Sequence, residues 1–157
     1  MVKFIRKPPP AFDEKELTLV AGGEVDEYHL SLRFFGDDLV PEEVTAALGC
    51  PPTSSCRKGD IFRGKKGERV EPHGKWLLKA PVSPGEPFDE QVTRFLAPLS
   101  QDLDVWRSLT SRFDADLFCG VWLRHWNRGM DLSPELMTAL SSRGLAASLD
   151  IYVDNDD

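Results

Sequence analysis

The sequence predicts an α+β domain in which a mixed or antiparallel sheet has helices packed mainly on one face. Strand-like and helical segments are mixed along the chain, which is typical of this class. Residues 28–34 are apolar at every second position, so this strand should have one buried side and one side facing solvent. Residues 115–125 are apolar on both sides, as expected for a strand inside a sheet. A variation on the ferredoxin-like arrangement is compatible with this order.

Length and composition favour one domain with two short flanking segments. The chain has 157 residues, enough for a single core. We expect an N-terminal extension over residues 1–27, a domain over 28–153 and an acidic tail over 154–157. The extension holds a proline run at 8–10 and an edge strand at 17–20. Basic residues near Met1 are not followed by an apolar stretch, and no 18-residue apolar window occurs, so we expect a cytoplasmic protein with no membrane contact.

Turn and cap signals set the elements of the first half. A helix should begin near Pro41, because proline suits the first helical turn, and end at Gly49. The glycine-containing stretch 55–69 predicts loop and hairpin pieces, and residues 75–79 form the next strand.

The second half should contain three helices and two strands. Apolar residues recur at helical spacing from 88 to 109, and Pro98 divides them into helices over 89–97 and 102–111. A third helix should start at the Ser133-Pro134 cap and end at Gly144. The last strand, 147–153, alternates again, which predicts that its odd-numbered apolar residues point inward; these are Ala147, Leu149, Ile151 and Val153.

An ordered set of short motifs resembles a bacterial family. The motifs are RFFGDDL at 33–39, PEEV at 41–44, RKGD at 57–60, GKW at 74–76, LSPEL at 132–136 and DIY at 150–152. Together they resemble the domain-of-unknown-function family numbered 4279, over residues of about 28–153. The resemblance implies a small bacterial cytoplasmic domain and supplies no catalytic residue.

Charge narrows the class of partner. The formal net charge is −7 and the isoelectric point is near 5.0, which disfavours nucleic-acid binding because a negative protein repels phosphate. The same charge is compatible with a basic protein partner. Three cysteines are too few for a disulfide framework.

Enzymatic motifs give no catalytic assignment. No Gly-x-Ser-x-Gly occurs, and a structural or surface role is the better interpretation of His29, His73 and His125. The carboxylates lack the spacing of a calcium loop, so we expect no metal site and no cofactor. Gly59 to Lys66 departs from a phosphate-binding loop, because Lys66 replaces the serine or threonine.

One basic stretch is a candidate binding site. Residues 55–69 hold six basic and two acidic residues in an otherwise acidic chain. We expect the turn formed by Arg57, Lys58, Gly59 and Asp60 to anchor a loop to the body, with Ile61 and Phe62 packing there and residues 63–69 forming a solvated tip. Cys56 beside these cations could have a lowered pKa, with an incidental thiol as the simpler interpretation.

The outward face of the sheet is a second candidate. Arg33 and Asp150 are expected to pair across strands, with Tyr152, Trp76 and Trp122 nearby. The leading hypothesis is a non-enzymatic protein-binding module, with an immunity-type role against a toxin as its narrower form. The alternative is a small-anion or ligand-binding domain, with weak or unknown catalytic activity, that uses the Arg57–Asp60 turn with Arg33. An exposed sheet edge would also invite a homodimer.

Overall fold

The computed structural model describes residues 23–124 and 128–153 of the chain. Strands and helices alternate through these residues, and the mixed sheet confirms the α+β class. The expected strand at 17–20, the proline run and the acidic tail lie outside the described residues, as does His125.

A five-stranded sheet forms the centre of the molecule, in the order β3-β6-β2-β7-β9. Its strands are β2 (Glu27–Gly36), β3 (Ser54–Cys56), β6 (Gly74–Lys79), β7 (Asp114–Leu123) and β9 (Ala146–Val153). The middle strand β2 runs antiparallel to both β6 and β7, whereas β7 and β9 are parallel. Helices connect each consecutive pair of the four long strands, so the β-α-β-α-β-α-β order of these elements differs from the β-α-β-β-α-β order of the ferredoxin-like fold.

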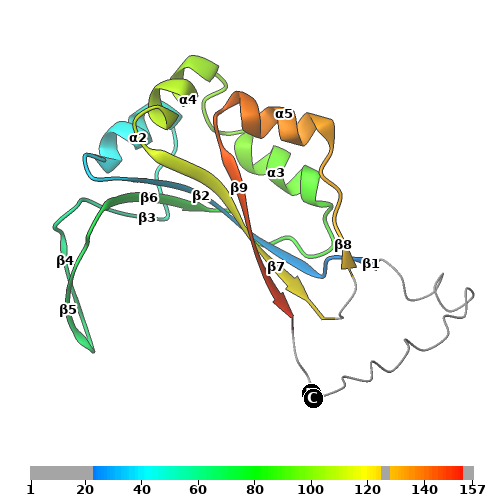
Figure 1. Ribbon diagram of the computed structural model, residues 1–157, viewed down its shortest axis with the longest axis horizontal. Helices are drawn as coiled ribbons and strands as arrows, with labels where there is room; N and C mark the ends of the chain where they lie inside the picture. The colour runs from blue at the N-terminus through cyan, green and yellow to red at the C-terminus, as the bar shows by residue number, and fades with distance from the viewer. Residues whose placement is uncertain (1–22, 125–127, 154–157) are drawn as a thin grey trace, which may run out of the picture.

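Four helices cover one face of this sheet (Figure 1). They are α2 (Pro41–Leu48), α3 (Phe88–Leu96), α4 (Leu103–Thr110) and α5 (Pro134–Ser142). The predicted end signals are present: Gly49 ends α2 with a φ of 75°, and the Ser133 hydroxyl caps α5 by accepting from the backbone N–H of Leu136. None of the helices in the described part of the chain has the length and apolar character needed to cross a bilayer.

The core lies between the sheet and the helices. Trp76 from β6 and Trp106 from α4 are both fully buried and flank Phe34 of β2, with ring centroids 5.8 and 6.4 Å from it. Each indole N–H is satisfied: Trp76 Nε1 donates to Thr45 Oγ1, and Trp106 Nε1 donates to the backbone carbonyl of Ser100. The polar ends of both tryptophans therefore help to orient α2 and the loop before α4.

A two-stranded hairpin, β4 (Ile61–Gly64) and β5 (Gly67–Val70), extends from the sheet to the side opposite the helices (Figure 1). The expectation that Ile61 and Phe62 pack on the body is wrong, because these side chains are 57% and 48% exposed. A ribbon with no third strand has no second layer to cover it. A further pair of two-residue strands, β1 (Gly23–Glu24) and β8 (Arg128–Gly129), is parallel.

The last strand is less buried than its pattern predicts. Ala147, Leu149, Ile151 and Val153 lie on the helix side, as their register with Leu117, Cys119, Val121 and Leu123 shows. All four are nevertheless exposed, because β9 is an edge strand and α5 covers it only in part. Alternation correctly gave the face of these residues but not their burial.

Candidate functional site

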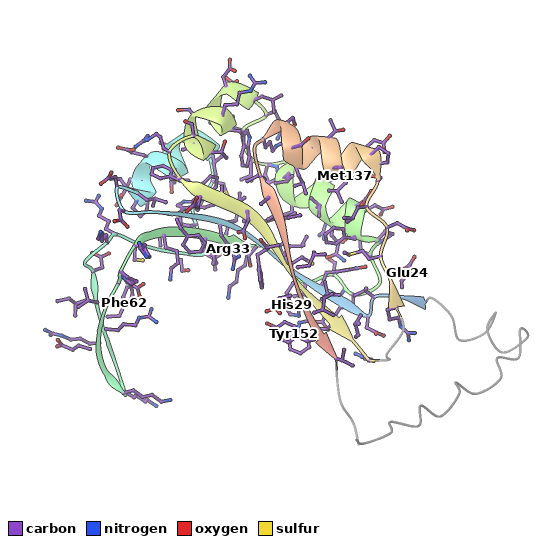
Figure 2. The ribbon with its side chains drawn as sticks, in the orientation of Figure 1. Glu24, His29, Arg33, Phe62, Met137 and Tyr152 are labelled. Carbon is purple, nitrogen blue, oxygen red and sulfur yellow. The ribbon has the colours of Figure 1, made fainter. Side chains whose placement is uncertain are left out.

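The sheet face opposite the helices carries most of the candidate residues. Alternate residues of β2, starting at Glu27 and including His29 and Arg33, point to this side, because their neighbours Tyr28, Leu30 and Leu32 are buried beneath the helices. Figure 2 shows Arg33, His29 and Tyr152 on the side of the sheet away from the helices, and Phe62 on the hairpin. We call this surface the open face.

A bidentate ion pair occupies the middle of the open face. Arg33 Nε donates to Asp116 Oδ1 at 2.8 Å and Arg33 Nη2 donates to Oδ2 at 2.5 Å, between directly opposed residues of β2 and β7. The Ser148 hydroxyl on β9 also donates to Asp116 Oδ2, at 2.6 Å. Burial of Asp116 opposes its ionisation, but the hydrogen bonds from Arg33 and Ser148 outweigh it and hold the pKa of this carboxyl below its usual value. The network ties three strands together.

Two aromatic rings also contact the Arg33 guanidinium. The Arg33 guanidinium carbon lies 4.1 Å from the ring centroid of Phe118 and 5.6 Å from that of Phe35. Two of its five N–H donors are used by Asp116 within the described structure, so others remain to meet a ligand or solvent. Arg33 is therefore a positioned cation in a partly apolar setting.

An aromatic cluster lies on the same face, six residues farther along β7 than Asp116. Trp122 of β7 stacks on Tyr152 of β9 with ring centroids 4.5 Å apart and an interplanar angle of 16°, and the two residues are 38% and 40% exposed. His29 meets the edge of Trp122 at 6.0 Å and its Nε2 lies 2.6 Å from Glu27 Oε1. Stacked rings of this kind give a large, stiff contact area with polar tips, as often found where proteins bind one another.

Two predicted features of this face are wrong. Arg33 does not pair with Asp150, because β7 lies between their strands and offers Asp116 directly opposite. Asp150 instead accepts a hydrogen bond from the Tyr152 hydroxyl, which raises the pKa of that tyrosine. Trp76 is not on the open face: it faces the helices and is fully buried. Trp122, Tyr152 and Asp150 do share a surface, as expected.

The Arg57–Asp60 turn forms a separate structure at the base of the hairpin. Asp60 Oδ2 accepts from the backbone N–H of Arg57 at 2.8 Å, and Gly59 has a φ of 88°, the left-handed conformation expected from its glycine. Arg57 pairs with Glu42 at 3.0 Å, and Lys58 pairs with Asp37. The turn therefore anchors the hairpin to the corner between β2 and α2, and its cations already have carboxylate partners. It shares no partner with Arg33.

The chemistry around Cys56 is that of a buried structural thiol. Desolvation raises the pKa of Cys56, against the expectation that Arg57 and Lys58 would lower it. The Cys56 Sγ faces the backbone carbonyl of His73. The His73 imidazole points elsewhere, and its Nδ1 lies 2.6 Å from Asp37 Oδ1. Asp37 binds both Lys58 and His73, and Val40 occupies the cap position of α2. These contacts hold the corner together.

One protein family matches most of this chain. The family described as "Domain of unknown function (DUF4279)" matches residues 26–154. The chain belongs to the DUF4279 family. No curated protein and no solved structure matches it.

The match places the candidate residues inside the shared DUF4279 domain. Residues 26–154 include the five strands of the sheet, the four helices and the hairpin, and so contain both the open face and the Arg57–Asp60 turn. Most of the N-terminal extension precedes the match. The motifs RKGD and DIY lie in the turn and on β9, so the resemblance located both regions although it gave neither a role.

The DUF4279 domain also has an acidic surface that sequence reasoning missed. A cavity of about 500 Å³ between α3 and α5 and another of about 320 Å³ beside β1 are lined by six carboxylates and one cation; these are Glu24, Glu86, Asp89, Glu90, Asp131 and Glu135, with Arg94. Glu86 and Arg94 form an ion pair. The residues are spread over more than 100 positions of sequence, and no local pattern could have grouped them.

Proposed function

We propose that this DUF4279 domain is a non-enzymatic protein-binding module that meets its partner through the open face. The observation that carries the proposal is the exposed Trp122–Tyr152 stack, which shares with the Arg33–Asp116 pair a sheet face that the four helices leave uncovered. Tryptophan, tyrosine and arginine are the side chains that most often dominate binding energy at protein interfaces. Stacking, hydrogen bonding and charge attraction can hold a partner without making or breaking a covalent bond.

Two further features support a protein as the ligand. The hairpin β4–β5 extends to the same side as the open face and presents exposed apolar and basic residues beside it. A partner seated on the open face would therefore meet both surfaces. The net charge of −7 favours a partner that carries net positive charge, because long-range attraction raises the rate of encounter. An immunity-type role against a basic bacterial toxin is the narrower form of this proposal.

The anion-binding alternative receives less support from the geometry. Arg57 and Lys58 each have a carboxylate partner, so an anion would have to displace Glu42 or Asp37. Arg33, which that alternative also uses, is bound to Asp116 on the open face. A structural role for the Arg57–Asp60 turn accounts for all of its contacts.

Capture from the native host tests the proposal. The tagged full chain, its Trp122→Ala variant and its Val82→Ala variant are compared by quantitative mass spectrometry of bound proteins. Val82 is a matched control because its exposure, 44%, is close to the 38% of Trp122 and it lies outside the open face. We expect a specific protein to be lost roughly tenfold or more with Trp122→Ala and kept with Val82→Ala.

Two results would count against the proposal. One is a specific partner that binds the Trp122→Ala and Tyr152→Ala variants as well as the original chain. The other is turnover of a substrate by the purified protein in an activity screen, with loss of that activity on Arg57→Ala, which would favour the ligand-binding alternative.

A further inference from the structure

The two edge strands of the sheet differ in length and in sequence. At one edge β3 is only three residues long and follows Pro51 and Pro52, so little backbone is available there for pairing with another chain. At the other edge β9 runs for eight residues, AASLDIYV, with no proline, lysine or arginine. Proline or lysine on a long edge strand usually prevents its backbone from pairing with another chain. An apolar edge strand without these residues therefore indicates a surface that pairs with another strand.

Apolar side chains gather along the helix side of β9. Leu149, Ile151 and Val153 are 44%, 59% and 46% exposed, and Met137 of α5 is 51% exposed. Met137 and Leu149 line the same apolar recess, together with Leu132 from the loop before α5. Contiguous apolar surface rimmed by polar groups is typical of an interaction site.

The sequence of β9 is complementary to itself in one antiparallel register. Directly opposed residues of an antiparallel pair have their side chains on the same face of the sheet. A two-fold axis perpendicular to the sheet must therefore pass between the two copies of one residue, which then lies opposite itself. An axis at Asp150 would set the two Asp150 carboxylates opposite each other, and like charges in that position are destabilising. An axis at Leu149 sets Leu149 against Leu149 and Asp150 against Ser148, a small neutral residue.

The remaining pairs of that register fit by size. Ala147 lies opposite Ile151 and Ala146 lies opposite Tyr152, so each larger side chain meets a smaller one. The Leu149–Leu149 and Ala147–Ile151 pairs fall on the helix side, next to Met137, whereas the Ala146–Tyr152 pair falls on the open face. Charge and side-chain volume therefore both favour an axis at Leu149 over one at Asp150.

We propose that the chain forms a symmetric dimer in which the β9 strands of two copies pair antiparallel about Leu149. The pairing joins two five-stranded sheets into one of ten strands, with all helices on one side and both open faces on the other. This inference rests on the edge strand and does not depend on the proposed function.

Cysteine cross-linking tests the register. The full chain carrying Cys50→Ser, which removes the most exposed native thiol, receives either Leu149→Cys or Val153→Cys. In the proposed dimer the two residues 149 are directly opposed, about 4.5–5.5 Å apart at Cα, a separation that a disulfide spans. The two residues 153 are about 26 Å apart. Mild oxidation should cross-link the Leu149→Cys chain and leave the Val153→Cys chain uncrosslinked.

Oligomeric state gives an independent test. We expect sedimentation of the unmodified full chain to show a dimer at about 100 μM, and Leu149→Lys to be a folded monomer because two lysines would meet on the axis. Val82→Lys is the matched control, since Val82 and Leu149 are both 44% exposed but Val82 lies in the loop after β6, and this variant should stay dimeric. A monomeric full chain, as would occur if residues 1–22 cover the edge, overturns the proposal. So does a dimer that survives Leu149→Lys or cross-links through residue 153.

Discussion

The guanidinium of Arg33 and the carboxylate of Asp116 join the two central strands by two parallel hydrogen bonds, on the face of the sheet that carries no helix. The side chains are 26% and 16% exposed, so the pair is neither fully solvated nor fully buried. In this setting a charge left without its partner is costly, and the pair can be studied by removing one member at a time.

Removing the cation should destabilise the fold. Arg33→Met keeps an apolar stem over Phe118 but leaves Asp116 with Ser148 alone, so the free energy of unfolding should fall by about 1–3 kcal/mol. The double variant Arg33→Met/Asp116→Asn should lose less than the sum of the single variants, with a coupling of roughly 1–2 kcal/mol, measured by urea denaturation. Additive losses would show that the two side chains act independently.

The same pair predicts a pH dependence. Because the pKa of Asp116 is lower in the folded chain than the unfolded value of about 3.9, its contribution to stability is complete above that value. It is lost as pH falls through the folded pKa. The difference in unfolding free energy between the original chain and Asp116→Asn should be constant from about pH 5 to 7 and shrink below about pH 4. A difference that grows on acidification would contradict this assignment.

Two tryptophans on opposite faces of the sheet should respond differently to truncation. Trp76→Ala removes a fully buried indole and its bond to Thr45, and should cost about 3–5 kcal/mol. Trp122→Ala removes an exposed ring whose stacking on Tyr152 contributes about 0.5–1.5 kcal/mol. Thermal unfolding followed by circular dichroism compares them. Equal losses would mean that the open face belongs to the core and would weaken the binding proposal.

The three cysteines should differ in reactivity. Burial raises the pKa of Cys119 to about 12 and also raises that of Cys56, so both should remain thiols at pH 8. Cys50 is more accessible. Brief alkylation with iodoacetamide, read by mass spectrometry, should modify Cys50 first and the other two only after unfolding. Rapid native-state modification of Cys56 would restore the hypothesis of a reactive thiol.

Gly74 is required by a close approach of backbone. A Cβ at this position would lie 2.8 Å from the carbonyl oxygens of both Gly36 and Leu39, so Gly74→Ala should cost about 1–3 kcal/mol or more. Gly129→Ala is the control, because a Cβ there meets nothing within 4 Å. Urea titrations of both variants check the contrast, and similar midpoints would show that the β2–α2 corner adjusts without cost.

Local patterns predicted the elements but not their neighbours. The break at Pro98, the Ser133 cap and the glycine at the end of α2 are decided by a few adjacent residues, and the structure has all three. The partner of Arg33 depends on strand order, which no adjacent residue encodes. The pairing of Arg33 with Asp116 could therefore be identified only from the strand order of the folded sheet.

Burial was harder to predict than orientation for the same reason. Alternation gave the correct side for Leu149 and Ile151, but their exposure follows from the position of β9 at the edge of the sheet. Trp76 was expected on a surface because tryptophan suits interfaces, whereas its register opposite Phe34 places it beneath the helices. Composition carries no information about which of two suitable places an aromatic ring takes.

At the base of the hairpin β4–β5 the two arms are bonded to each other, because the backbone N–H of Gly59 donates to the carbonyl of Glu71 and that of Glu71 donates to the carbonyl of Asp60. Its strands are exposed on both faces, so its residues add surface and little to the stability of the core. The length and side chains of this segment can therefore change during evolution while the domain folds as before.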